Sequence, residues 1–242
     1  MGNLRGKNDK VDAIRIGEYA YRNQETVRLW EPKREVIQEL SHLAALRSRL
    51  VEVGKIIKTP LKENGVFMRK GMEKLTNHLC SKTIKGLETD LERVEEAIDQ
   101  IITSDAELKR LFAIVTSVSS IGKVTAVMIL VTTNEFKDIK DPKKFACYAG
   151  VAPFPNESGL FKGKPRVSHQ ANKKMKTLLH LAALGSIQHN EEIKVYYHRK
   201  TVDERKNKMS TLNAIRNKLI LRIFACVNQN RPFEKNYSRL VA

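Results

Sequence analysis

Two stretches of the chain repeat their apolar residues with the heptad spacing of helices that pack on other helices. Within residues 33–58 the repeat consists of Leu43, Leu46, Leu50, Val53 and Ile57. Within residues 83–103 it consists of Ile84, Leu87, Leu91, Val94, Ile98 and Ile101. Such narrow stripes predict an antiparallel coiled-coil arm whose first helix ends at Pro60. Two ordinary amphipathic helices packed on a larger core are the alternative.

Helical patterns also dominate the rest of the chain, so the predicted fold class is mainly α. Further helices are expected over residues 9–23, 172–189, 193–205 and 211–228. Gly and Pro gather between residues 141 and 165, which predicts a single long loop-rich stretch of the kind that often carries function. Residues 145–152 are a candidate short strand within it.

The charge of the chain indicates a polyanionic partner. Lys and Arg number 44 against 27 Asp and Glu, a formal net charge of +17. A field of that size favours nucleic acid, because each neutralised phosphate releases condensed counterions. An anionic membrane surface is the next option, and the lack of a long apolar run argues against it. The wide spacing of three cysteines and the polar first ten residues predict a cytoplasmic protein with reduced thiols.

A tight turn around Gly122 separates two helical patterns. The turn is followed by Lys123, and the start of the second helix directs backbone N–H groups outward, where they suit a phosphate. We interpret this segment as a helix-hairpin-helix-like element that contacts nucleic acid through Gly122 and Lys123. An ordinary glycine turn between two helices is the alternative.

Ser158 precedes Gly159 in the loop-rich stretch and is the candidate nucleophile. Three cations follow it closely, namely Lys162, Lys164 and Arg166. A serine attacks phosphorus only when a base or a metal ion stabilises its alkoxide, so on the residues alone an ordinary turn serine is favoured. The basic segment that follows contains Asn172, Lys173 and Lys174, which we expect to bind phosphates.

Asp9 and Asp12 lie three residues apart in the first predicted helix, so their carboxylates share one side. Two carboxylates in that position can share a Mg²⁺ ion. On spacing alone, an acidic first turn favoured by the helix dipole is the better interpretation.

Together these segments resemble one family, the insertion-sequence transposases with a DEDD-type resolvase-like (RNase H-like) domain, a coiled-coil arm and a C-terminal serine-bearing transposase domain. These enzymes are described as bridge-RNA-guided recombinases. The resemblance covers nearly the whole chain, and its matching segments are residues 7–13, 121–126, 136–137, 145–153, 158–159, 166–168, 172–175 and 231–233.

The resemblance implies three domains: a resolvase-like remnant over residues 1–32, the arm over 33–107 and a compact helical transposase domain over 108–242. It implies that Ser158 attacks a DNA phosphate and that Asp9 and Asp12 are the last two acidic ligands of a Mg²⁺ site. The implied partners are DNA and a structured guide RNA. The implied assembly is a homodimer or tetramer, and the implied setting is the prokaryotic nucleoid.

The chain departs from the family in two places. The family's first Asp and its Glu precede the segment at which this chain begins, and Ala171 stands where the family usually has Gly. We therefore expect a shortened reading frame or an N-terminally cut chain that binds nucleic acid but cuts and joins DNA poorly or not at all. The rival interpretations are a non-catalytic DNA- or RNA-binding module and a structural coiled-coil adaptor.

Overall fold

The computed structural model describes residues 8–26, 31–64, 70–159, 161–168 and 170–235. The chain divides into two units, residues 1–33 and 34–242. The described part of the first unit is essentially one helix, α1 (Asp9–Arg22), as predicted. Asn8 caps it, because its side chain accepts a hydrogen bond from the backbone N–H of Lys10 at 3.0 Å. Among the described residues, no helix combines the length and the apolar composition that crossing a membrane requires.

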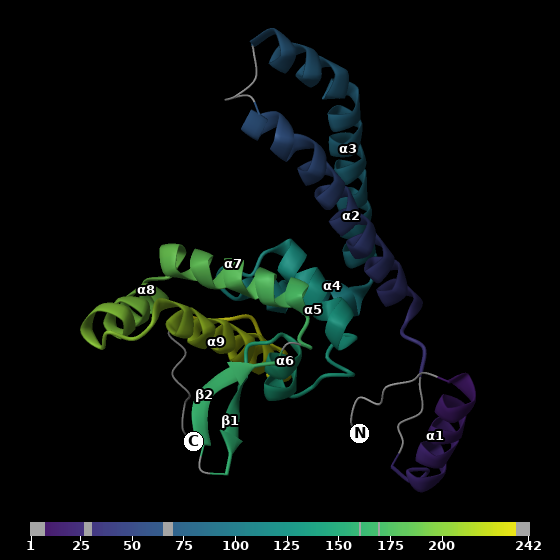
Figure 1. Ribbon diagram of the computed structural model, residues 1–242, viewed down its shortest axis with the longest axis vertical. Coiled ribbons are helices and arrows are strands. Elements are labelled where there is room, and N and C mark those ends of the chain that lie inside the picture. The colour runs from purple at the N-terminus through teal and green to yellow at the C-terminus, as the bar shows by residue number, and fades with distance from the viewer. Residues whose placement is uncertain (1–7, 27–30, 65–69, 160, 169, 236–242) are drawn as a thin grey trace. The chain divides into compact units, whose positions relative to one another are not determined.

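The second unit confirms the prediction of a mainly α fold (Figure 1). Its helices and strands are α2 (Glu35–Asn64), α3 (Lys70–Ser104), α4 (Ala106–Ser117), α5 (Lys123–Thr133), α6 (Pro142–Tyr148), β1 (Pro153–Ser158), β2 (Phe161–Val167), α7 (Lys173–His189), α8 (Glu191–His198), a π-helical turn at Arg199–Asp203, and α9 (Lys208–Asn228). We call α2 and α3 the arm, and the helices from α4 to α9 the body.

The arm consists of two long helices that run antiparallel (Figure 1). Two ion pairs fix their direction, since Arg47 pairs with Glu95 at 2.6 Å and Lys58 pairs with Glu88 at 2.6 Å. The predicted stripe of α3 is confirmed: its members are buried or half-buried along the whole series, down to Ile98 at 2 % exposure.

Three details of the predicted arm were wrong. Both helices extend beyond their expected ends, because α2 passes through Pro60 and α3 begins thirteen residues before the expected Thr83. In α2, Leu43, Leu50 and Ile57 are half-buried as predicted, but Leu46 and Val53 are 37 % and 43 % exposed, and Arg47 is half-buried. The predicted stripe of α2 is therefore confirmed at three of its five positions and wrong at Leu46 and Val53.

The body is built around α9, whose apolar side is buried against α4, α6 and α7. An aromatic cluster joins three segments: the ring of Phe224 lies 5.0 Å from that of Phe136 and 5.4 Å from that of Phe145. Such pairs add to the free energy of burial. The hydrophobic core is continuous with the base of the arm, since Ile37, Leu40 and Ile98 belong to the same buried cluster.

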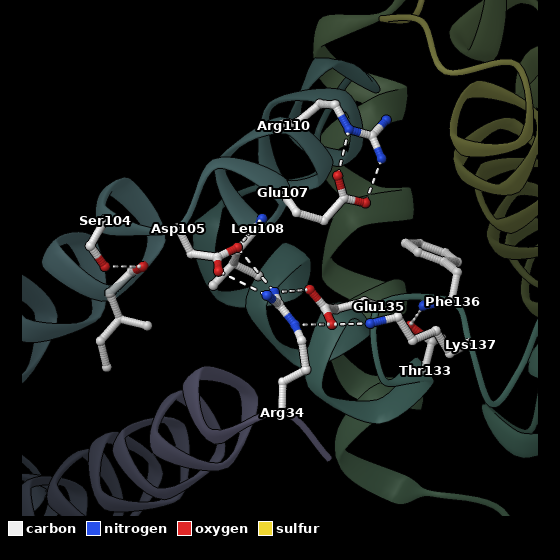
Figure 2. A network of polar contacts seen from close by, with 11 residues as sticks. Arg34, Ser104, Asp105, Glu107, Leu108, Arg110, Thr133, Glu135, Phe136 and Lys137 are labelled. Atoms are coloured by element: carbon white, nitrogen blue, oxygen red, sulfur yellow. Dashed lines mark hydrogen bonds and ion pairs between the residues drawn. The ribbon is translucent and has the colours of Figure 1, made fainter.

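Arg34 fixes the start of α2 to the body (Figure 2). Its guanidinium pairs with Asp105, the N-cap of α4, at 2.9 Å and with the buried carboxylate of Glu135 at 2.5 Å. Glu135 belongs to a turn of three residues with left-handed backbone, with φ values of 49° at Asn134, 56° at Glu135 and 62° at Phe136. Non-glycine residues are strained in that region, so the ion pair stabilises an unfavourable turn.

The expected loop-rich stretch is more regular than predicted. Residues 145–152 are not a strand: helix α6 begins after its N-cap Asp141 with Pro142 in the first turn, and it ends in a turn at Gly150. The strands β1 and β2 follow as an antiparallel hairpin, where a loop was expected. The pairing of its strands is irregular between Phe154 and Asn156, at Pro155 and near Pro165 of the other strand. Proline has no backbone N–H, so it interrupts the regular series of hydrogen bonds between two strands.

Candidate functional site

Ser158 lies at the end of β1, beside the turn of the hairpin. Its backbone pairs with that of Phe161, and the turn between them contains Gly159 with φ +55°. Every residue of β1 is exposed, so no described helix covers this strand. A hairpin of two strands gains little stability by itself, and one that stands clear of the body is suited to contact another molecule.

The surroundings of Ser158 are accessible but chemically sparse. Its hydroxyl has no hydrogen-bond partner among the described residues, so none of them orients or activates it in this structure. Side chains alternate along a strand, which puts Phe154 on the same face as Ser158, and the cross-strand partner of Phe154 is Arg166. Arg166 is therefore nearer the base of the hairpin, opposite a residue that lies four positions before Ser158 on β1. Lys162 and Lys164 belong to β2, and their side chains lie outside the described part.

Tyr148 and Asn172 close the base of the hairpin. The backbone N–H of Asn172 donates to the carbonyl oxygen of Tyr148 at 2.8 Å. The side-chain amide of Asn172 donates to the phenol oxygen of Tyr148 at 2.7 Å. The other amide atom, Oδ1, accepts from the backbone N–H of Met175 at 2.9 Å and so caps α7. We call this pair the clasp, because it joins the end of α6 to the start of α7.

Gly150 and Ala171 pack together beside the clasp. Gly150 has φ +64°, a conformation that favours glycine, and it ends α6. A Cβ atom added at Gly150 would lie 2.6 Å from the Cβ of Ala171. The close approach therefore requires glycine at position 150 and a small residue at position 171.

Helix α9 supports the same region from behind. Asn213 donates its side-chain amide to the carbonyl oxygen of Val151 at 2.7 Å, just after α6. Arg216, which is 4 % exposed, donates to Nδ1 of His180 at 2.7 Å and reaches Asn213 at 3.3 Å. Burial, and then the charge of Arg216, lower the pKa of His180 below its ordinary value. The imidazole that accepts from Arg216 is therefore the neutral form.

Lys173 and Lys174 lie in the first turn of α7 and line a groove between the arm and the body. We call it the arm–body groove; its volume is about 460 Å³. Its lining residues are Arg47, Ser48, Val51, Glu52, Lys55, Val124, Met128, Lys173, Lys174, Thr177 and Leu178. Four of these are cations and one is an acid, which suits an anionic ligand. The structure thus brings two predicted residues together with Arg47 and Lys55, which were not predicted.

Gly122 and Lys123 begin α5, beside this groove. Gly122 is the N-cap of the helix, and a Cβ atom added to it would have no neighbouring atom within 4 Å. The ammonium of Lys123 donates to the carboxylate of Asp99 at 2.6 Å and to the carbonyl oxygen of Glu95 at 3.0 Å. Lys123 therefore ties α5 to the arm, and a phosphate would have to compete with Asp99 for it.

Asp9 and Asp12 lie in the first turn of α1 and are both exposed. Asp12 is 3.8 Å from the guanidinium of Arg15. In the described part of the chain, no group of three or more His, Cys, Asp or Glu side chains comes together to hold a metal ion. The two carboxylates alone do not make a closed Mg²⁺ site, because such a site uses six oxygen ligands and a fixed octahedral geometry.

Comparison with known proteins places these elements in context. Residues 113–198 match the family described as Transposase IS116/IS110/IS902. The matched region contains the turn before α5, the serine hairpin, the clasp and the start of α7.

Two curated relatives align with almost the whole chain. They are the pilin gene-inverting proteins of Moraxella bovis and Moraxella lacunata, each 26 % identical over 236 residues, which is 96 % of this chain and 69 % of the relative. The segment that holds the hairpin and the clasp is therefore similar to the transposases of the IS116/IS110/IS902 family, and the chain is distantly related to two proteins named for gene inversion.

Proposed function

We propose that the chain acts in DNA transposition or recombination, binding DNA and cleaving and joining strands with Ser158 as the nucleophile. The observation that carries the proposal is the exposed Ser158 on a hairpin whose base is closed onto the basic start of α7. Similarity to a transposase family and to two gene-inverting proteins supports the reaction class.

In the proposed reaction, the Oγ atom of Ser158 bonds to a DNA phosphorus and the bond to a deoxyribose oxygen breaks. The serine proton passes to solvent water, and the departing sugar oxygen takes up a proton. The strand is then held as a phosphodiester on Ser158 until a sugar hydroxyl attacks and restores the DNA. Such covalent catalysis conserves the energy of the phosphodiester bond through both steps.

The groove cations would hold the DNA near the hairpin. Lys173 and Lys174 have no acidic partner among the described residues, so they are available to phosphates. Asp9 and Asp12 would supply two ligands of a Mg²⁺ site whose other ligands come from outside the described residues. We also propose that the chain binds a structured guide RNA and acts as a homodimer or tetramer.

A duplex with bridging phosphorothiolate linkages tests the nucleophile. Its thiolate leaving group departs without acid or metal assistance, so an attacking serine remains joined to the strand. Duplexes from the DNA that flanks the coding sequence, with sulfur at the 3′ or the 5′ bridging position, are incubated with the chain and resolved on a denaturing gel. We expect an adduct with the unchanged chain and with the Ser168→Ala control, and none with Ser158→Ala.

A non-catalytic DNA- or RNA-binding module is the second candidate function. It is favoured by one observation, namely that the hydroxyl of Ser158 has no hydrogen-bond partner in the described residues. This candidate predicts unchanged binding and no adduct with any of the three proteins. An adduct that persists in Ser158→Ala would contradict the serine mechanism.

A further inference from the structure

The arm helix α2 has a row of cations on one side. They are Arg47, Lys55, Lys58 and Lys62. At 3.6 residues per turn, these four positions lie within an arc of about 80° around the helix. At about 1.5 Å per residue, the row is roughly 22 Å long. The row therefore forms a narrow basic strip parallel to the axis of the arm.

Two hollows make this strip a continuous track. The arm–body groove lies at its lower end, where α2 faces α5 and α7. A second hollow of about 290 Å³ lies between α2 and α3 and is lined by Lys55, Lys58 and Lys62 together with Glu88. Val51 and Lys55 line both hollows, so the two hollows lie next to each other along α2.

The charges along the track are only partly neutralised within the protein. Arg47 and Lys58 pair with Glu95 and Glu88 of α3. Lys55 and Lys62 have no acidic partner in the part of the chain that the structure describes. Glu52 is the one acid that lines the groove itself. A linear excess of positive charge remains, which is the electrostatic pattern that a phosphate backbone meets.

The second hollow, between α2 and α3, has an apolar floor. Leu50, Leu87 and Leu91 line it beneath the lysines. A surface with ammonium groups at its rim and aliphatic carbon at its floor suits a phosphodiester chain, in which charged phosphates alternate with sugars. A simple anion such as free phosphate would use only one or two of these cations.

We propose that the α2 track, defined by Arg47, Lys55, Lys58 and Lys62, binds the phosphate backbone of a nucleic acid along the arm, in continuity with Lys173 and Lys174. The partner class rests on the proposed function, but the binding surface does not require Ser158 to react. The arm is then a nucleic-acid-binding element in its own right, in addition to any part it has in assembly.

Binding measured against salt tests this proposal with a matched pair of variants. Lys55→Gln/Lys62→Gln removes the two unneutralised cations of the track. Lys82→Gln/Lys85→Gln removes two exposed cations of α3 that line neither hollow, with the same change in net charge. Fluorescence anisotropy with a 30-base-pair duplex, a DNA single strand and a structured RNA is followed from 50 to 300 mM KCl. Circular dichroism and the unfolding midpoint verify that both variants fold.

The variant Lys55→Gln/Lys62→Gln should bind nucleic acid about 10-fold more weakly than the unchanged chain at 0.1 M salt. Its slope of log K against log salt should be smaller by about 1.8 on duplex DNA, or by about 1.4 on a single strand. The control pair should leave the slope close to that of the unchanged chain. The ligand with the largest difference between the pairs identifies whether DNA or RNA occupies the track.

Equal losses in the two pairs, or no binding by the unchanged chain to any of the three ligands, would overturn the proposal. The adduct experiment and the binding experiment distinguish failure of the serine mechanism from failure of the track. A Ser158 adduct with an unaffected track pair contradicts the track alone, and track-dependent binding without an adduct contradicts the serine mechanism alone.

Discussion

The amide nitrogen of Asn172 lies 2.7 Å from the phenol oxygen of Tyr148, and their backbones are joined by a second hydrogen bond of 2.8 Å. These two contacts connect the end of α6 to the cap of α7 on either side of the serine hairpin. The hairpin is exposed along β1, so its orientation relative to the basic start of α7 depends on this connection.

Removing the clasp should reduce stability in two separable parts. Asn172→Ala removes both the cap of α7 and the side-chain bond, and should lower the free energy of unfolding by about 1–2 kcal/mol. Tyr148→Phe removes only the side-chain bond and should lower it by about 0.5–1 kcal/mol. Asn172→Ser can still cap the helix but is too short to reach Tyr148, so in urea unfolding it should match Tyr148→Phe. A Tyr148→Phe variant as destabilised as Asn172→Ala would contradict this division.

Gly150→Ala should destabilise the protein because of both backbone strain and a clash. Its φ of +64° disfavours a side chain, and its new Cβ would meet Ala171 at 2.6 Å. We expect a loss of about 2–4 kcal/mol. Gly159→Ala has similar backbone strain with open space around it, so it should lose only about 1 kcal/mol. Thermal unfolding of Gly150→Ala/Ala171→Gly should recover part of the loss, and no recovery would show that the clash is unimportant.

Arg34→Met should be more destabilising than loss of an ordinary ion pair of the arm. Arg34 neutralises Glu135, whose side chain is 1 % exposed, and also binds the cap residue Asp105. Leaving a buried carboxylate with Lys137 as its remaining partner should cost about 2–3 kcal/mol in urea unfolding. Lys58→Met breaks an exposed pair and should cost less than about 1 kcal/mol. Equal effects would mean that the Arg34 contacts add nothing to an ordinary surface pair.

Stability should fall in mild acid because of His180. Burial and then Arg216 lower its folded-state pKa, whereas the unfolded value stays near about 6.5. The unfolded chain therefore binds a proton first as pH falls, so the stabilisation is complete above about pH 6.5 and is lost as pH drops through the folded-state pKa. His180→Gln keeps an acceptor for Arg216 without titrating. Its unfolding midpoint should change less between pH 7 and 5, and a profile as steep as that of the unchanged chain would exclude His180 as the cause.

The sequence predicted the structure best where apolar residues recurred at a regular helical spacing without interruption. The stripe from Ile84 to Ile101 identified the buried side of α3 correctly, because six apolar residues left little choice of face. In α2 the same reasoning selected the wrong face at Leu46 and Val53. Arg47 can turn inward because it pairs with Glu95 of α3. Helix α2 continues through Pro60 where neighbouring Ile56 is 67 % exposed, so water can satisfy a carbonyl that has lost its partner.

The candidate site could be predicted only residue by residue. Ser158 and Lys173 stood out through their local neighbours, but the three prolines of the hairpin concealed its strands. The groove was not predictable because Lys55 and Lys173 are 118 positions apart and are brought together only by the packing of α2, α5 and α7. The spacing of Arg47, Lys55, Lys58 and Lys62 was the one available signal, since it puts four cations on one side of a helix.

The chemical identity of the residue that joins DNA tests the central claim most directly. The adduct trapped with a phosphorothiolate duplex can be trimmed with nuclease, digested with a protease and sequenced by tandem mass spectrometry. We predict a nucleotide joined through phosphate to Ser158. A nucleotide on any other residue, or strand joining without an adduct on the protein, would contradict the serine mechanism.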